Sequence, residues 1–217
     1  MTEPRFLIVN ADDLGMTAAI NEGIFAAHEG GIVTSASLMV LRDAAPTAVE
    51  ALAGYPDLAV GLHLESAFVL CNPVGDKGRT PDLKCRKQLE RFRALLGRNP
   101  THLDSHKHVH ECKPAFGAAA EALAAELEVP LRNRGIRYER RFYGRDAISP
   151  EHLIRLIEGL PPGWTEIGCH PAAGPVPTSS YDAERQIELA TLRDPRVKNL
   201  LNVTSVQLCS FAQVNPC

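Results

Sequence analysis

Short apolar runs alternate along the chain with longer segments of helical periodicity. This alternation is typical of βα units that build a largely parallel sheet. The alternation therefore predicts an α/β fold, and the number of apolar runs, seven, is close to the number of strands in a barrel. The predicted strands are Arg5–Asn10, Ile32–Val40, Leu58–His63, Thr101–Asp104, Val129–Arg132, Thr165–Cys169 and Ser205–Cys209.

The segments between the runs carry helix signals. Ala18–Gly30 follows Thr17, a residue type favoured at helix N-termini, and Gly30 with Gly31 provides its stop. Glu65–Leu83 instead contains Pro and Gly with little periodicity, which predicts a functional or mobile loop. The other predicted helices are Pro46–Gly54, Arg86–Leu96, Pro114–Leu127, Pro150–Gly159 and Asp182–Leu192.

Length and charge narrow the class of protein. The 217 residues are enough for one core and show no linker-like shift in composition, so we expect a single domain over residues 1–217. A net charge of −3 provides no basic field for a nucleic acid. The apolar runs are too short for a membrane span or a signal-peptide core, and the six cysteines form no C-x-x-C pair. We therefore expect a cytoplasmic protein with reduced thiols.

Polar residues follow five of the predicted strands directly. In parallel α/β folds the reacting groups lie beyond the carboxyl ends of the strands. These ends should therefore form one rim that carries two carboxylates, three imidazoles and a guanidinium: Asp12, Asp13, His63, His106, Arg132 and His170.

Two imidazoles and one carboxylate are a common ligand set for a catalytic divalent metal. Asp12 and Asp13 are adjacent, so one could bind the metal while the other accepts a proton from the attacking water. His170 comes from another strand and could protonate a leaving group. The set predicts metal-assisted hydrolysis.

A tract of alternating histidines is the most unusual feature of the composition. It consists of His102, Asp104, His106, His108 and His110. Fully extended, it would span ~26 Å at ~3.3 Å per residue, far more than one metal's coordination shell, so only one or two members could be ligands. Cys112 lies nearby, but the lack of a second cysteine pair argues against a zinc finger. Cys169 precedes His170 in a strand and should point away from it into the core.

These residues lie in stretches that resemble the YdjC-like carbohydrate deacetylases. The resemblance implies a distorted (β/α) barrel like that of other polysaccharide deacetylases, with an Asp-His-His metal site for Mg²⁺ or Zn²⁺, and a homodimer. It assigns Asp13, His63 and His106 to the metal and makes Asp12 the base. It makes His170 the general acid or oxyanion stabiliser and Arg132 an orienting residue. The matching stretches are LIVNADDLGM (7–16), GIVTSASLMV (31–40), LAVGLHL (58–64), PTHLDSHKHVH (100–110) and EIGCHPA (166–172).

The resemblance implies a substrate that is an acetamido sugar or a glycoconjugate carrying one. The chain is shorter than many relatives between Gly144 and Trp164 and around Glu65–Leu83, where the substrate-selecting rim should lie. Glu65 also stands where a neutral residue is expected. Two alternatives remain open: hydrolysis of another amide or of a phosphoester, and a non-catalytic, metal-stabilised sugar-binding protein.

Overall fold

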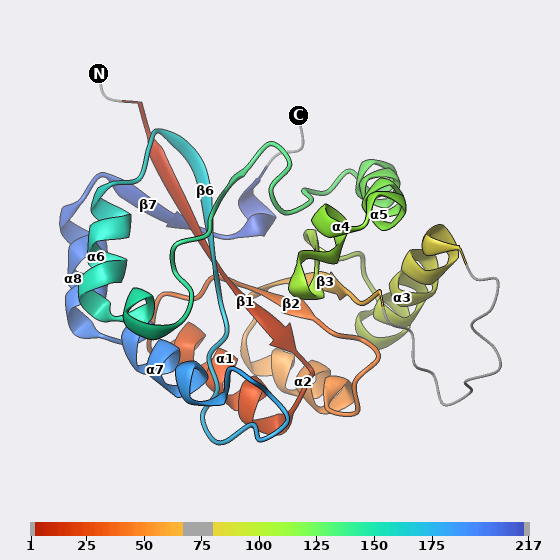
Figure 1. The fold of residues 1–217 in the computed structure, drawn as a ribbon, viewed down its shortest axis with the longest axis horizontal. Helices are drawn as coiled ribbons and strands as arrows, with labels where there is room; N and C mark the ends of the chain where they lie inside the picture. The colour runs from red at the N-terminus through yellow and green to blue at the C-terminus, as the bar shows by residue number, and fades with distance from the viewer. Residues whose placement is uncertain (1–2, 67–79, 215–217) are drawn as a thin grey trace.

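The computed structural model describes residues 3–66 and 80–214. Within these residues the core is a seven-stranded parallel sheet in the order β4-β3-β2-β1-β6-β5, with β7 also paired to β1 (Figure 1). The predicted α/β fold of about seven parallel strands is confirmed. The strands are β1 (Arg5–Leu14), β2 (Ser35–Leu38), β3 (Ala59–Leu64), β4 (Leu103–Ser105), β5 (Arg137–Glu139), β6 (Gly163–Cys169) and β7 (Val206–Cys209).

The barrel is distorted at two places. One edge of β1 pairs with β6 from Arg5 to Ala11. Its other edge pairs first with β7, over Arg5–Ile8, and then with β2, from Asn10 onward. On the opposite side, β4 reaches the chain before β5 through a single bridge between Leu103 and Leu131. The sheet therefore curves into a barrel that does not close with regular strand pairing.

Helices surround the outside of the sheet (Figure 1). As predicted, Thr17 caps α1, its hydroxyl oxygen accepting a hydrogen bond from the backbone N–H of Ile20. No helix among residues 3–66 and 80–214 is long and apolar enough to cross a membrane. The helices are α1 (Ala18–Glu29), α2 (Ala45–Ala51), α3 (Pro81–Leu96), α4 (Val109–Cys112), α5 (Pro114–Leu127), α6 (Pro150–Glu158), α7 (Asp182–Leu192) and α8 (Pro195–Val203).

Several sequence predictions differ from the structure, and strand β2 covers only Ser35–Leu38 of the predicted Ile32–Val40. The strand predicted at Val129–Arg132 is only the isolated bridge at Leu131, because the chain turns at Asn133, which has a φ of 57°, before β5 begins. Helix α3 starts at Pro81, five residues before its predicted start, and Thr80 caps it. Helix α8 was not predicted, although Asp194 caps it. Most of the predicted loop Glu65–Leu83 lies outside the described residues.

The histidine tract does not continue as a strand. Strand β4 ends at Ser105, and a 3₁₀ turn, His106–His108, leads directly into α4. Lys107 and His108 have φ values of 55° and 51°, in the left-handed region. The two histidines on either side of these residues differ in burial: His106 is half-buried, whereas His110 is buried.

Candidate active site

A bulge at the end of β1 places both aspartates on the same side. The register between β1 and β2 shifts between Ala11 and Leu14, and Asp13 has a φ of 70°. In a regular strand, two successive side chains would point to opposite faces. Left-handed backbone at a residue other than glycine costs ~1–3 kcal/mol, and such residues cluster at functional sites. Asp12 and Asp13 therefore both face the cavity at the carboxyl ends of the strands.

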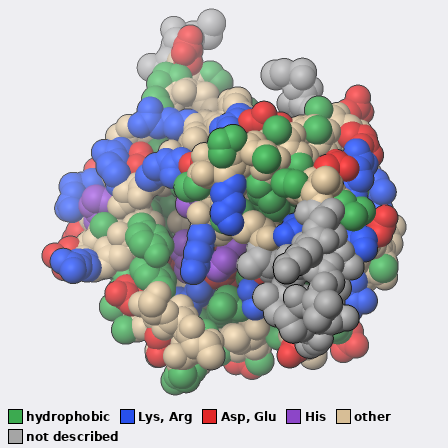
Figure 2. Space-filling view, turned by 45° about the vertical axis from the view of Figure 1, so that its right-hand side comes forward, with side chains coloured by type: hydrophobic (Ala, Val, Ile, Leu, Met, Phe, Trp, Pro, Cys, Tyr) green, Lys and Arg blue, Asp and Glu red, His purple; other side chains and the backbone are tan. Residues whose placement is uncertain are grey.

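This cavity has a volume of about 440 Å³. Figure 2 shows it as a hollow with histidine side chains at its bottom and Lys and Arg side chains at its edge. Arg132 lies beneath the cavity and is fully buried. The structure thus brings all six predicted site residues to one end of the barrel, and five of them line the cavity: Asp12, Asp13, His63, His106 and His170.

Asp13, His63 and His106 form a compact group. The Asp13 Oδ1 atom lies 3.0 Å from His106 Nδ1 and 3.4 Å from His63 Nε2. One donor atom from each of the three residues lies within 4.8 Å of the other two, which fits a single divalent cation with nitrogen and oxygen ligands.

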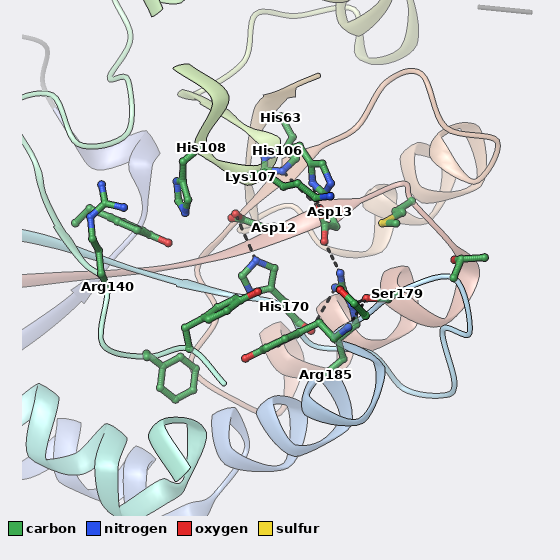
Figure 3. Close-up of a pocket in the computed structure, with 17 residues that line it drawn as sticks. Asp12, Asp13, His63, His106, Lys107, His108, Arg140, His170, Ser179 and Arg185 are labelled. Atoms are coloured by element: carbon green, nitrogen blue, oxygen red, sulfur yellow. Dashed lines mark hydrogen bonds and ion pairs between the residues drawn. The ribbon is translucent and has the colours of Figure 1, made fainter. Parts of the chain in front are cut away.

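Neighbouring side chains hold this group in place. His63 Nδ1 donates to Asp104 Oδ1 at 2.8 Å, which leaves Nε2 facing Asp13, as in the carboxylate–histidine pairs that orient metal ligands. Arg185 donates to Asp13 Oδ2 at 2.6 Å, so only Oδ1 faces the two histidines (Figure 3). Burial raises the pKa of Asp13, but the bonds from His106 and His63 outweigh it and hold that pKa well below its usual value.

Asp12 is held by a buried arginine. Arg132 Nη1 and Nη2 donate to Asp12 Oδ2 and Oδ1 at 2.7 and 2.6 Å, and Asn10 Nδ2 donates to Oδ1 at 2.9 Å. Burial raises the pKa of Asp12, but the charge of Arg132 outweighs it and the pKa is lowered. Asp12 is therefore an ionised carboxylate with a fixed orientation, next to the Asp13 group.

Arg132 also holds two other carboxylates. Its Nη2 lies 2.9 Å from Asp104 Oδ2 and 2.7 Å from Glu166 Oε1. Burial raises the pKa of Glu166 to about 7, despite the nearby guanidinium. One arginine therefore links Asp12 to Asp104, the partner of His63.

Replacing Arg132 with Met should destabilise the protein by about 3–5 kcal/mol, because three buried carboxylates lose their common counter-charge. The free energy of unfolding in urea measures this. Adding Glu166→Gln should recover part of the loss, since one of the stranded carboxylates is removed. Arg134→Met is the matched control, because its side chain is 45% exposed, and we expect a change within about 0.5 kcal/mol. Equal stabilities for the two Met variants would contradict this account.

His170 follows β6 and faces Asp12 from across the cavity (Figure 3). Its Nε2 lies 3.9 Å from Asp12 Oδ2, and its Nδ1 lies 3.9 Å from Glu188 Oε1. The backbone N–H of His170 donates to Glu188, and Tyr181 Oη donates to Glu188 Oε1 at 2.7 Å. Burial lowers the pKa of His170, but Glu188 outweighs it and the pKa is raised. This favours the protonated imidazolium next to Asp12.

The other histidines of the tract have different surroundings. His102 is fully buried and stacks on Phe211 at 3.9 Å, and burial lowers its pKa to about 3. His110 Nε2 lies 3.3 Å from the backbone oxygen of Arg132. His108 packs against Tyr138 at the cavity wall, and burial lowers its pKa to about 4.

Two other residues noted in the sequence stay outside the cavity lining. Cys169 is fully buried, as predicted, and burial raises its thiol pKa well above the usual value. The Glu65 side chain is paired with Arg42.

Several residues that organise the site were not identified from the sequence. Asp104 was noted only as a member of the histidine tract. The others are Glu166 in β6 and, three residues apart in α7, Arg185 and Glu188. The apolar pattern of α7 gave no signal for the last two, because Ala183, Ile187 and Ala190 are exposed and the buried face is largely polar.

The fold is that of the family 4 carbohydrate esterases. The structure of such an esterase from Streptomyces lividans, in complex with acetate, matches with a TM-score of 0.59 over 96% of this chain and 93% of the esterase, at 12% identity. More specifically, the chain belongs to the family of YdjC-like proteins, whose model matches residues 6–74 and 82–203.

Similar proteins cover nearly the whole chain. A carbohydrate deacetylase from Geobacillus stearothermophilus is 36% identical, over 97% of this chain and 98% of the relative. A chitooligosaccharide deacetylase from Yersinia pestis is 32% identical, over 95% of this chain and 98% of the relative. A solved structure from Enterococcus faecalis is described as a proposed cellobiose-phosphate cleavage protein. It matches with a TM-score of 0.83 at 26% identity, over 96% of this chain and 98% of the other.

The chain is also shorter than the relative it matches. The alignment with the Geobacillus stearothermophilus protein spans 247 positions, whereas this chain has 217 residues, so at least 30 positions of the relative face gaps here. The overall shortening expected from the sequence is therefore confirmed, whereas its two expected places stay predictions.

Proposed function

We propose that this protein is a metal-dependent N-deacetylase that removes the acetyl group from an acetamido sugar of the N-acetylglucosamine type, free or in a glycoconjugate. The observation that carries the proposal is the meeting of the Asp13, His63 and His106 group with Asp12 and His170 in one cavity. The deacetylase names of the relatives support the same reaction.

We assign the metal to Asp13, His63 and His106. A divalent cation bound there supplies Lewis-acid activation of water and of the acetyl carbonyl. Two imidazoles suit Zn²⁺, whereas Mg²⁺ prefers oxygen ligands, so the donor set favours Zn²⁺.

Asp12 and His170 carry the protons. Asp12 accepts a proton from the water that attacks the acetyl carbon, and Arg132 keeps Asp12 ionised and oriented for this step. His170 then donates a proton to the nitrogen as the carbon–nitrogen bond breaks. A carbon–oxygen bond replaces the carbon–nitrogen bond, and the products are acetate and the free amino sugar.

A product assay tests the reaction. Protein purified without chelator and reconstituted with Zn²⁺ or Mg²⁺ is incubated with a diacetylated chitooligosaccharide, a non-sugar acetamide and a sugar phosphoester. We expect acetate and free amine in equal amounts from the chitooligosaccharide. Phosphate release, or cleavage of the non-sugar amide alone, would favour the alternative hydrolases. Sugar binding without any product would favour a binding protein.

The pH dependence tests the assignment of His170. We expect kcat of the metal-saturated enzyme to fall as His170 loses its proton, at a pH above the usual pKa of 6.5, because Glu188 raises the pKa. Glu188→Gln keeps an oxygen acceptor but removes the negative charge, so this alkaline limb should move to lower pH. Glu158→Gln, on the exposed side of α6, should leave the limb in place. If the alkaline fall of kcat occurs at the same pH in Glu188→Gln as in the native enzyme, His170 is rejected as the general acid.

Three expectations accompany this proposal and stay predictions: a single domain over residues 1–217, a cytoplasmic location and a homodimer. Cell fractionation tests the location, and sedimentation analysis tests the homodimer.

A further inference from the structure

Tyr143 is an aromatic residue that is exposed at the edge of the cavity. Its exposed fraction is 59%, and it lines the cavity beside His170. Among the described residues, the other large apolar side chains with comparable exposure lie away from this cavity: Leu83, Ile187, Val203 and Leu208. Single exposed apolar residues are common on protein surfaces, but Tyr143 is the one of these five that lines the cavity, which makes it the candidate for a ligand contact.

The surroundings of Tyr143 hold its ring in one orientation. The ring stacks on Tyr181, with centroids 4.6 Å apart and planes 12° from parallel. Tyr181 is itself anchored, because its hydroxyl donates to Glu188 and accepts a hydrogen bond from the backbone N–H of Gly144 at 2.7 Å. The residue after Tyr143 is therefore tied to the ring that supports Tyr143. The stack covers one face of the Tyr143 ring, while the residue as a whole stays 59% exposed.

The Tyr143 ring lies next to His170, the proton donor of the proposed reaction. The ring centroids of Tyr143 and His170 are 5.7 Å apart, and that of Tyr181 lies 5.6 Å from His170, so His170 borders the edge of the stacked pair. In the proposed deacetylation, His170 protonates a nitrogen that is bonded directly to the sugar ring. The sugar ring must therefore lie next to His170, and Tyr143 is the exposed aromatic ring at that place.

We propose that Tyr143 is a sugar-binding platform, on which a pyranose ring of the substrate lays its apolar C–H face. Aromatic rings provide large apolar contact area at low entropic cost, and a stacked ring is ordered before the sugar arrives. This inference rests on the proposed deacetylase function and adds a residue that selects for a pyranose ring.

Binding and turnover measured separately test the platform. Binding of a diacetylated chitooligosaccharide is measured by calorimetry in the metal-loaded Asp12→Asn background, and acetate release in the otherwise native enzyme. Tyr143→Ala should raise Kd and KM about 3- to 10-fold and change kcat less than about threefold. Tyr143→Phe keeps the ring and should bind within about twofold of the parent. Val203→Ala, 81% exposed on α8, is the surface control.

The other outcomes are distinguishable. If Tyr143 only supports Tyr181 and Glu188, Tyr143→Ala will lower kcat and shift the alkaline limb while Kd stays unchanged, and the platform is rejected. Should Tyr143→Ala unfold, Tyr143→Leu provides the same comparison with apolar bulk but no flat ring. A native enzyme that releases no acetate from any acetamido sugar rejects the proposed function itself, whereas active enzyme with unchanged Kd in the Tyr143 variants rejects only the platform.

Discussion

Replacing Asp12 with Asn should abolish most deacetylase activity while leaving metal binding intact. Asn has nearly the shape of Asp but cannot accept the proton of the attacking water, and loss of a general base typically lowers kcat by about 10²–10⁴-fold. The donor atoms assigned to the metal belong to Asp13, His63 and His106 and are untouched. The fold should persist, because Arg132 keeps Asp104 and Glu166 as partners. Acetate release and elemental analysis of the same sample measure both properties.

Asp57→Asn is the matched control for this variant. Asp57 is exposed and precedes β3 at the opposite end of that strand from His63, so activity should be unchanged. An Asp12→Asn enzyme with more than about a tenth of native kcat would contradict the assignment of Asp12 as base. Loss of metal in this variant would instead place Asp12 among the ligands.

Replacing His63 with Ala should abolish both metal binding and activity. The change removes one of three donors and leaves Asp104 and Asp13 without the imidazole that lies between them. Loss of a partner that merely orients a metal ligand lowers affinity by 10–100-fold, so loss of a ligand itself should cost more than about 100-fold. Competition with a metal-sensitive dye measures the affinity, and acetate release measures the activity.

The control for His63→Ala is His152→Ala. His152 lies on α6 away from the cavity, where its Nε2 contacts the backbone oxygen of Arg141. That variant should bind metal like the native protein. Native metal affinity in His63→Ala would reject the Asp-His-His site, and with it the second candidate group, Asp12 with His63 and Asp104, because His63 belongs to both.

The sequence predicted the elements with strong apolar patterns and missed those without them. The helix predicted at Pro150–Gly159 begins where α6 begins, because Ser149 caps it and Leu153, Leu156 and Ile157 recur at helical spacing on its buried face. Strand β5 has the sequence Arg-Tyr-Glu and forms because β6 provides a partner, so no local pattern predicts it. The bulge at Asp13 was likewise invisible, because it arises from the shifted register between β1 and β2.

The order of apolar runs by itself determined a parallel α/β fold, and the residues after each run determined which side chains gather at its rim. These are local properties, since side-chain period and strand direction follow from neighbouring residues. Only the tertiary structure decided which atoms meet. The partners of His63, Asp12 and Asp13 lie 41, 120 and 172 residues away, at Asp104, Arg132 and Arg185. Barrel curvature and strand register bring such distant residues together, and no local pattern encodes the distance between them.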